Sequence, residues 1–196
     1  MTILADDQDE RETPGLAPNP VVLIAGSAAI AALSFAALPL VPAIASTLLG
    51  ALMVAGADID SRTFLLPDTV SFGAMASGLV AAFVLAPDQP WLDVAIALAR
   101  GIGSAAVLAA LAFGYWRWRA QEGLGLGDIK LAAAIGIWLP LHLIPACFAL
   151  AAVAGLVAAG LAHLRGRAMT GATPIPFGAF LCPALWLVFY ASALPN

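Results

Sequence analysis

Long apolar stretches follow one another along almost the whole of this chain, with only short polar breaks between them. The stretches are residues 20–38, 41–57, 69–87, 92–115, 128–139, 143–163 and 177–194. A helix needs about 20 apolar residues to cross a bilayer, and the fifth stretch is short for a full span. A backbone inside a membrane must satisfy its own hydrogen bonds, which a helix does within one segment. The pattern predicts an all-α, polytopic membrane protein with about seven transmembrane helices.

The scarcity of charged residues excludes several other classes of protein. Charged residues make up 10% of this chain, against about 25% in a typical soluble domain. Hydrophobic residues make up 62%, and a soluble globule of this size could not bury that much apolar surface. We therefore expect neither a cytosolic enzyme nor a disordered protein, and no nucleic-acid partner. The expected surroundings are a lipid bilayer.

The acidic residues divide the chain into two parts. The first 19 residues contain five acidic residues and one arginine, while the remaining 177 contain seven acidic and seven basic residues. We predict a disordered, acidic, cytoplasmic tail over residues 1–19 and one membrane domain over residues 20–196. Cys147 and Cys182 each lie in an apolar run. They form no CxxC motif and are expected to be buried, small apolar residues.

The basic residues predict which side of the membrane each connection faces. Between the stretches they fall at Arg62, at 117–130 and at 165–167, and seven spans place all three regions on one side. The positive-inside rule assigns that side, and the N-terminus with it, to the cytoplasm. Arg100 lies inside the fourth stretch, where we expect it to reach the outer face or to pair with Asp93.

Two clusters of polar residues lie on this predicted cytoplasmic side. Residues 58–68 follow the second stretch, and residues 123–130 lead into the fifth. Asp60 and Asp128 are 68 positions apart, yet the topology returns them to the same membrane depth. Two carboxylates held close together ionise as a pair and share one proton. One can then take a proton from water while the other donates to a carbonyl oxygen, as in aspartyl proteases.

The spacing alone leaves other roles open for these residues. Asp128 on its own could cap the helix that follows it. The pair could also serve a non-enzymatic ion or proton transporter, because intramembrane acids suit that role, or the chain could be a structural membrane subunit. The glycine run at 123–127 is not followed by the Lys-Ser/Thr of a phosphate-binding loop. Neither a metal nor a cofactor is expected, since the chain carries no HExxH motif and no CxxC motif.

Three segments together resemble one known family. Residues 60–68 (DSRTFLLPD) are similar to its first motif, an Asp followed seven positions later by Pro and then by Asp or Asn. Residues 125–138 (GLGDIKLAAAIGIW) match the pattern GxGDxKLxAAxGxW at every specified position. Residues 174–181 (PIPFGAFL) are similar to PxPFGPFL, with Ala179 in place of the third proline. In these segments the chain resembles the type IV prepilin peptidases, membrane aspartyl proteases of the GxGD class.

The resemblance implies roles for particular residues. Asp60 and Asp128 would be the catalytic pair; Asp58 lies nine positions before Pro67, so the motif spacing favours Asp60. Substrate-binding or supporting roles would fall to Gly125, Gly127, Lys130, Pro67, Asp68, Pro176 and Gly178. Asp68 is expected to be structural. Lys130 could bias the aspartate pair or simply face lipid headgroups.

The resemblance also implies a substrate and a location. The substrate would be a type IV prepilin or a type II secretion pseudopilin, with a short basic leader, a glycine before the scissile bond and an apolar helix after it. The enzyme would lie in the bacterial cytoplasmic (inner) membrane, with its active site facing the cytoplasm and its peptidase domain over residues 20–196. Many members carry an N-terminal insertion with paired CxxC motifs that is linked to N-methylation. This sequence has neither, so we do not expect methyltransferase activity. The sequence does not indicate the pilin system or the oligomeric state.

Overall fold

The structure is a computed structural model that describes residues 17–86, 88–119, 125–165 and 176–195. Most of the acidic tail predicted for residues 1–19 lies outside these ranges, as do Gly123, Pro174 and Ile175 of the motif segments. The described residues form helices and connections without a strand. The helices are α1 (Pro20–Ala37), α2 (Leu40–Thr63), α3 (Asp68–Leu85), α4 (Pro90–Arg119), α5 (Leu126–Trp138), α6 (Ile144–Leu164) and α7 (Phe177–Ala193). The prediction of an all-α, polytopic membrane protein is confirmed.

Two helices extend beyond the apolar stretches that predict them. α2 continues through Thr63, so Asp58 and Asp60 lie in its last turns and not in the connection that follows. α4 continues to Arg119. In both cases polar residues extend a helix past the end of the apolar run, because backbone hydrogen bonding does not depend on hydropathy.

Within the ranges that the structure describes, five helices are long and apolar enough to cross a membrane, namely α1, α2, α3, α4 and α6. α7 is apolar but shorter, with 17 residues. α5 has 13 residues and therefore a length of about 20 Å, which is well below the roughly 30 Å of a hydrocarbon core. α5 is instead an internal helix that packs against α3, α4 and α7.

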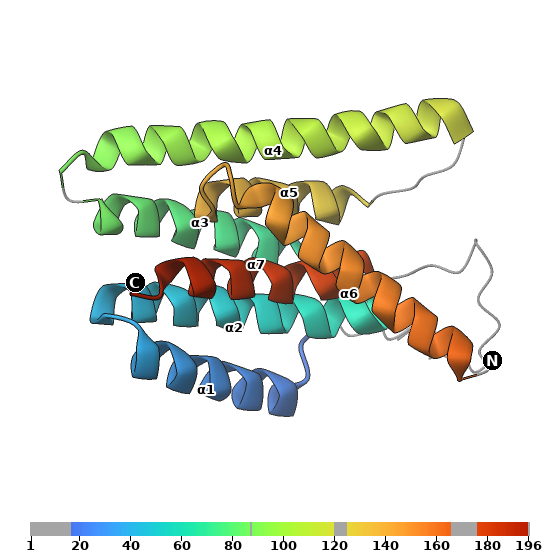
Figure 1. Ribbon diagram of the computed structural model, residues 1–196, viewed down its shortest axis with the longest axis horizontal. Coiled ribbons are helices and arrows are strands. Elements are labelled where there is room, and N and C mark those ends of the chain that lie inside the picture. The colour runs from blue at the N-terminus through green and yellow to red at the C-terminus, as the bar shows by residue number, and fades with distance from the viewer. Residues whose placement is uncertain (1–16, 87, 120–124, 166–175, 196) are drawn as a thin grey trace, which may run out of the picture.

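Successive helices run in alternating directions, and α6 crosses the others at a steep angle (Figure 1). One end of the molecule therefore gathers the C-terminal ends of α2, α4 and α6 with the N-terminal ends of α3, α5 and α7 (Figure 1). Asp60 lies near the C-terminal end of α2 and Asp128 in the first turn of α5. The expected return of both carboxylates to one end of the bundle is confirmed. We call this end the aspartate end.

Small residues let α5 approach its neighbours closely. A Cβ atom at Gly136 would lie 2.4 Å from the carbonyl oxygen of Arg100 on α4, and one at Gly78 would lie 2.7 Å from Nε1 of Trp138. The α5 residues Leu131, Ala132, Ala134 and Ile135 are fully buried. Close backbone approach through glycine is a common way to pack helices where lipid provides no hydrophobic driving force. α5 is thereby fixed in the centre of the bundle.

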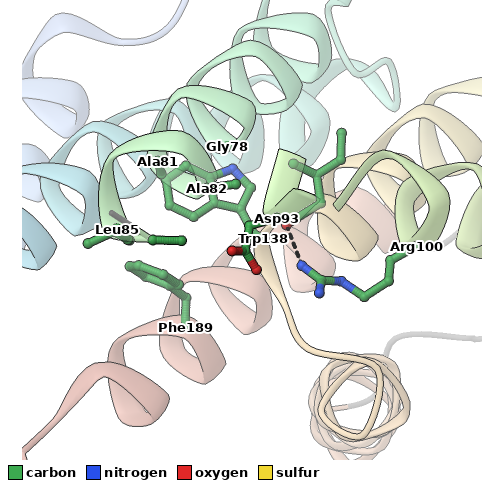
Figure 2. A pocket seen from close by; sticks show the side chains of 10 residues that line it. Gly78, Ala81, Ala82, Leu85, Asp93, Arg100, Trp138 and Phe189 are labelled. Carbon is green, nitrogen blue, oxygen red and sulfur yellow. Dashed lines mark hydrogen bonds between the residues drawn. The ribbon is translucent and has the colours of Figure 1, made fainter. Parts of the chain in front are cut away.

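Arg100 has a role in this packing that the sequence does not indicate. Its Nε donates to the carbonyl oxygen of Gly136 at 3.1 Å and its Nη2 to that of Ile137 at 3.3 Å. These are carbonyls of the last turn of α5, which have no partner within the helix. Figure 2 shows Arg100 beside Trp138 and Asp93 in a cavity of about 180 Å³. Arg100 caps the end of α5 opposite to Asp128, a role that the expectations from the sequence do not include, and Asp93 lines the same cavity.

Both cysteines are buried and unpaired, as the sequence predicts. Cys182 on α7 lies against α2, where a Cβ atom at Gly56 would come within 3.0 Å of its sulfur. Gly56 is one helical turn before Asp60. Cys182 therefore lies where α7 packs closely against α2, next to Asp60.

Candidate active site

Asp60 is buried at the contact between α2 and α7. Asp60 is 6% exposed, and its Oδ2 accepts a hydrogen bond of 2.7 Å from the backbone N–H of Ala179. Gly178 leaves the space that the carboxylate occupies, since a Cβ atom there would lie 2.9 Å from both Cγ and Oδ2 of Asp60. The segment that begins α7 thus forms one wall of a tight seat for this carboxylate.

Asp58 faces a different part of the molecule. Its Oδ2 accepts hydrogen bonds from the backbone N–H of Asn19 at 2.7 Å and from Nη2 of Arg62 at 2.6 Å. Two residues along a helix turn the side chain by about 200°, so Asp58 and Asp60 point away from each other. The structure therefore ties Asp58 to the start of α1 and leaves Asp60 on the side of α7. The motif spacing also favours Asp60 over Asp58.

Asp128 lies in the first turn of α5, outside the five helices that could span a membrane. Its backbone N–H donates to the carbonyl oxygen of Gly125 at 3.1 Å. Burial, and after it the nearby charge of Asp60, raises the pKa of the Asp128 carboxyl to about 6. Asp60 and Asp128 lie at the same end of the bundle, as a pair that shares a proton must.

The connection between α2 and α3 closes over the glycines that precede Asp128. Phe64 ends α2 in the left-handed conformation, with φ of 56°, and it is the only non-glycine residue with positive φ among those described. The chain then turns through Leu66, against which Gly127 packs so closely that a Cβ atom would lie 3.0 Å from the Cβ of Leu66. A side chain at position 127 would push α5 away from this connection. Gly127 therefore permits the close approach of the two motif segments.

Pro67, Asp68 and Lys130 link α3 to α5 at the same end. The carbonyl of Pro67 accepts hydrogen bonds from the backbone N–H groups of Val70 and Ser71, so Pro67 begins α3. Asp68 and Lys130 form an ion pair. Lys130 thus pairs with Asp68. The sequence suggests two other roles, an influence on the aspartate pair or a contact with lipid headgroups. The pair holds the starts of α3 and α5 in register and gives Asp68 a structural contact.

Some of the site could not be found from the sequence. The contribution of Ala179 is a backbone N–H, which every residue except proline carries, so no pattern of side chains reveals it. Pro176 ends the connection before α7, where it occupies the position just before the helix. Gly125 is exposed and occupies the corresponding position before α5.

A largely apolar groove of about 530 Å³ leads to Ala179 between α1, α2 and α7. Its wall includes Ile30, Met53, Val54 and Trp186 along its length, with Ser61 and Ala179 near the aspartate end. A groove of this kind can accept an apolar chain segment whose polar end lies at the membrane surface.

Comparison with known proteins agrees with the resemblance of the motif segments. The type IV leader peptidase family matches residues 47–160. A protein of Burkholderia pseudomallei named prepilin leader peptidase/N-methyltransferase is 36% identical over 173 residues, which cover 86% of this chain and 53% of that protein. One of the same name from Xanthomonas campestris is 34% identical over 145 residues, which cover 72% and 48%.

A shorter relative is covered more completely. The leader peptidase HopD of Escherichia coli is 36% identical over 137 residues, which cover 69% of this chain and 84% of HopD. This chain spans about half the length of the two prepilin leader peptidase/N-methyltransferases above. No solved structure matches the chain significantly. The transporter interpretation finds no support in these comparisons. More than half of the chain matches the family and the relatives exceed 30% identity, so this multi-pass membrane protein belongs to the type IV leader peptidase family.

Proposed function

We propose that this protein is a membrane aspartyl endopeptidase that removes the leader from type IV prepilins or type II secretion pseudopilins. The observation that carries the proposal is the meeting of Asp60 and Asp128 at one end of the bundle. Asp60 is buried where α2 meets α7, and Asp128 lies in the first turn of α5 at the same end. Membership of the leader peptidase family gives the reaction class.

The proposed reaction uses one ionised and one protonated carboxyl group. The ionised carboxylate takes a proton from a water molecule, and the oxygen of that water attacks the scissile carbonyl carbon. The protonated carboxyl gives its proton to the carbonyl oxygen as the tetrahedral intermediate forms. When the C–N bond breaks, the leaving amine takes up the proton that the first carboxylate had accepted, and one hydroxyl group of the intermediate returns a proton to the second carboxylate. The products are a leader with a free carboxylate and a mature protein with a free amino group.

The surroundings of the pair suit a substrate that lies at a membrane surface. Arg62, Arg117, Arg119 and Arg165 lie near the ends of helices that reach the aspartate end. By the positive-inside rule this end would face the cytoplasm, in the bacterial inner membrane. The groove beside Ala179 would accept the apolar segment that follows the scissile bond. The scissile bond itself would then lie near Ala179, whose N–H donates to Asp60.

Leader cleavage by purified protein tests the proposal, with a prepilin or pseudopilin from the same organism as substrate. Asp60→Asn and Asp128→Asn should each abolish cleavage while the protein still inserts into membranes. Asp93→Asn is the control, because Asp93 lies in the first turn of α4, whose N-terminal end is opposite to the aspartate end (Figure 1). It should cleave at nearly the wild-type rate. Near-normal cleavage by either Asp60→Asn or Asp128→Asn would exclude the mechanism.

A further inference from the structure

The two carboxylates of the site accept backbone hydrogen bonds from different parts of the fold. Oδ2 of Asp60 accepts from the N–H of Ala179, the third residue of α7, at 2.7 Å. The first N–H groups of a helix have no partner within it and carry its partial positive charge. Among the residues that the structure describes, the carboxyl group of Asp128 accepts a hydrogen bond from the backbone of Gly125, an exposed residue in the connection before its own helix. The part-buried donor from another helix therefore belongs to Asp60.

We propose, on the basis of the peptidase function proposed above, that the N–H of Ala179 fixes the single negative charge of the pair on Asp60. Asp60 is then the base that takes the proton from water, and Asp128 is the acid that protonates the carbonyl oxygen. Ala179 acts through Asp60 and is a positioning residue. Gly178 supports the same arrangement, because its missing side chain lets the carboxylate approach the start of α7.

Few other charged groups on the helices that pack against α2 could influence the ionisation of Asp60. α2 packs against α1, α3 and α7. α1 carries no titratable side chain, and the one on α3, Asp68, pairs with Lys130 of α5. α7 contributes the buried thiol of Cys182 beside Asp60 and, at its far end, Tyr190. The remaining charged groups on α2, Asp58 and Arg62, pair with each other. Among the described residues, Asp128 and the Ala179 N–H therefore dominate the surroundings of Asp60.

Proline at position 179 is the sharpest perturbation. It removes the N–H that Ala179 donates to Asp60, and the first turn of a helix tolerates proline because no intrahelical bond is lost there. The segment that residues 174–181 resemble carries proline at this position, so the variant should fold. Ala179→Gly is the matched control, since it keeps the N–H.

The expected result is an asymmetric change in the pH profile of leader cleavage. Asp60 takes up a proton at the acidic limb, so losing the N–H in Ala179→Pro should raise that limb by about one pH unit. The basic limb reports loss of the proton from Asp128, and it should stay in place. Ala179→Gly should reproduce the wild-type profile.

Other outcomes would overturn the assignment. An unchanged acidic limb in Ala179→Pro would mean that the N–H does not control the charge. A shift of the basic limb alone would place the charge on Asp128. If wild-type protein cleaves no leader at any pH, the proposed function fails instead.

Infrared titration provides a test that does not depend on activity. In an Asp128→Asn background, the carboxyl band of Asp60 should lose its proton at a pH about one unit higher when Ala179→Pro is added. Equal titration of the two proteins would overturn the proposal, even if Ala179→Pro is inactive.

Discussion

Adding a single methyl group at Gly178 should separate activity from stability. In Gly178→Ala the new Cβ would lie 2.9 Å from Cγ and Oδ2 of Asp60. Carbon atoms pack at about 3.5–4.0 Å, so the carboxylate must retreat by roughly 0.6–1 Å. Its end can move by side-chain rotation, which keeps the cost in stability small. A misplacement of about 1 Å can lower a rate about 100-fold, and we expect kcat/KM for leader cleavage to fall by about that factor.

Gly136→Ala provides the opposite case. Its Cβ would lie 2.4 Å from the carbonyl oxygen and 2.7 Å from the carbonyl carbon of Arg100. These are backbone atoms of a helix, so α4 and α5 must separate. Overpacking of this kind costs about 1–3 kcal/mol of unfolding free energy. The main effect should be a lower melting temperature in detergent.

Gly160→Ala is the control for both, because a Cβ atom there would meet nothing within 4 Å. Cleavage rates and thermal melts of all three variants, measured in the same detergent, complete the test. If Gly178→Ala cleaves as fast as Gly160→Ala, the seat for Asp60 has no part in catalysis. If Gly178→Ala melts as low as Gly136→Ala, the carboxylate is rigidly held and the reasoning from side-chain freedom is wrong.

Further predictions concern the caps and charges around α5. Arg100→Leu leaves the last carbonyls of α5 without their donor and should lower the unfolding free energy by about 1–3 kcal/mol, whereas Arg100→Lys should restore part of it; equal melting of both variants and wild type would argue against the cap. Lys130→Gln removes a partly exposed ion pair with Asp68, so stability should change by about 0–1 kcal/mol and the pH profile of cleavage should not move. A moved profile would show that Lys130 acts on the aspartates. The pKa of Asp128, about 6, exceeds its ordinary value, so the folded state holds a proton that the unfolded state loses and stability falls as pH rises from about 4 to 6. Asp128→Asn should therefore melt higher than wild type at pH 7.5 and show a smaller advantage at pH 4; an equal difference at both would contradict the shift.

The contact of Asp60 with α7 explains why three distant segments are needed for one site. α2 supplies the carboxylate, α5 supplies its partner, and the start of α7 supplies the space and the N–H. The Asp68–Lys130 ion pair and the contact of Leu66 with Gly127 hold the first two segments together. The motif residues thus divide into the carboxylates themselves and the residues that let backbones meet around them.

The sequence by itself determined the class of fold and most of the motif positions. Apolar runs of about 20 residues specify helices, because inside a membrane the backbone must satisfy its own hydrogen bonds locally. The order of the runs and the short breaks also specify that Asp60 and Asp128 return to one end. The spacing to Pro67 selected Asp60 over Asp58. All of these properties depend on neighbours in the chain or on the alternation of helix direction.

Only the tertiary structure decided how the carboxylates are held. Four features of the structure depend on residues more than 30 positions apart. They are the burial of Asp60, its bond to Ala179, the pairing of Lys130 with Asp68 and the cap that Arg100 forms on α5. The bonds of Ala179 and Arg100 also use backbone atoms, which are chemically alike at almost every residue. Which N–H meets which carboxylate depends on how one helix is rotated and shifted against another. That geometry is set by close packing at glycines such as Gly136 and Gly178, where a difference of less than 1 Å decides whether two helices can touch.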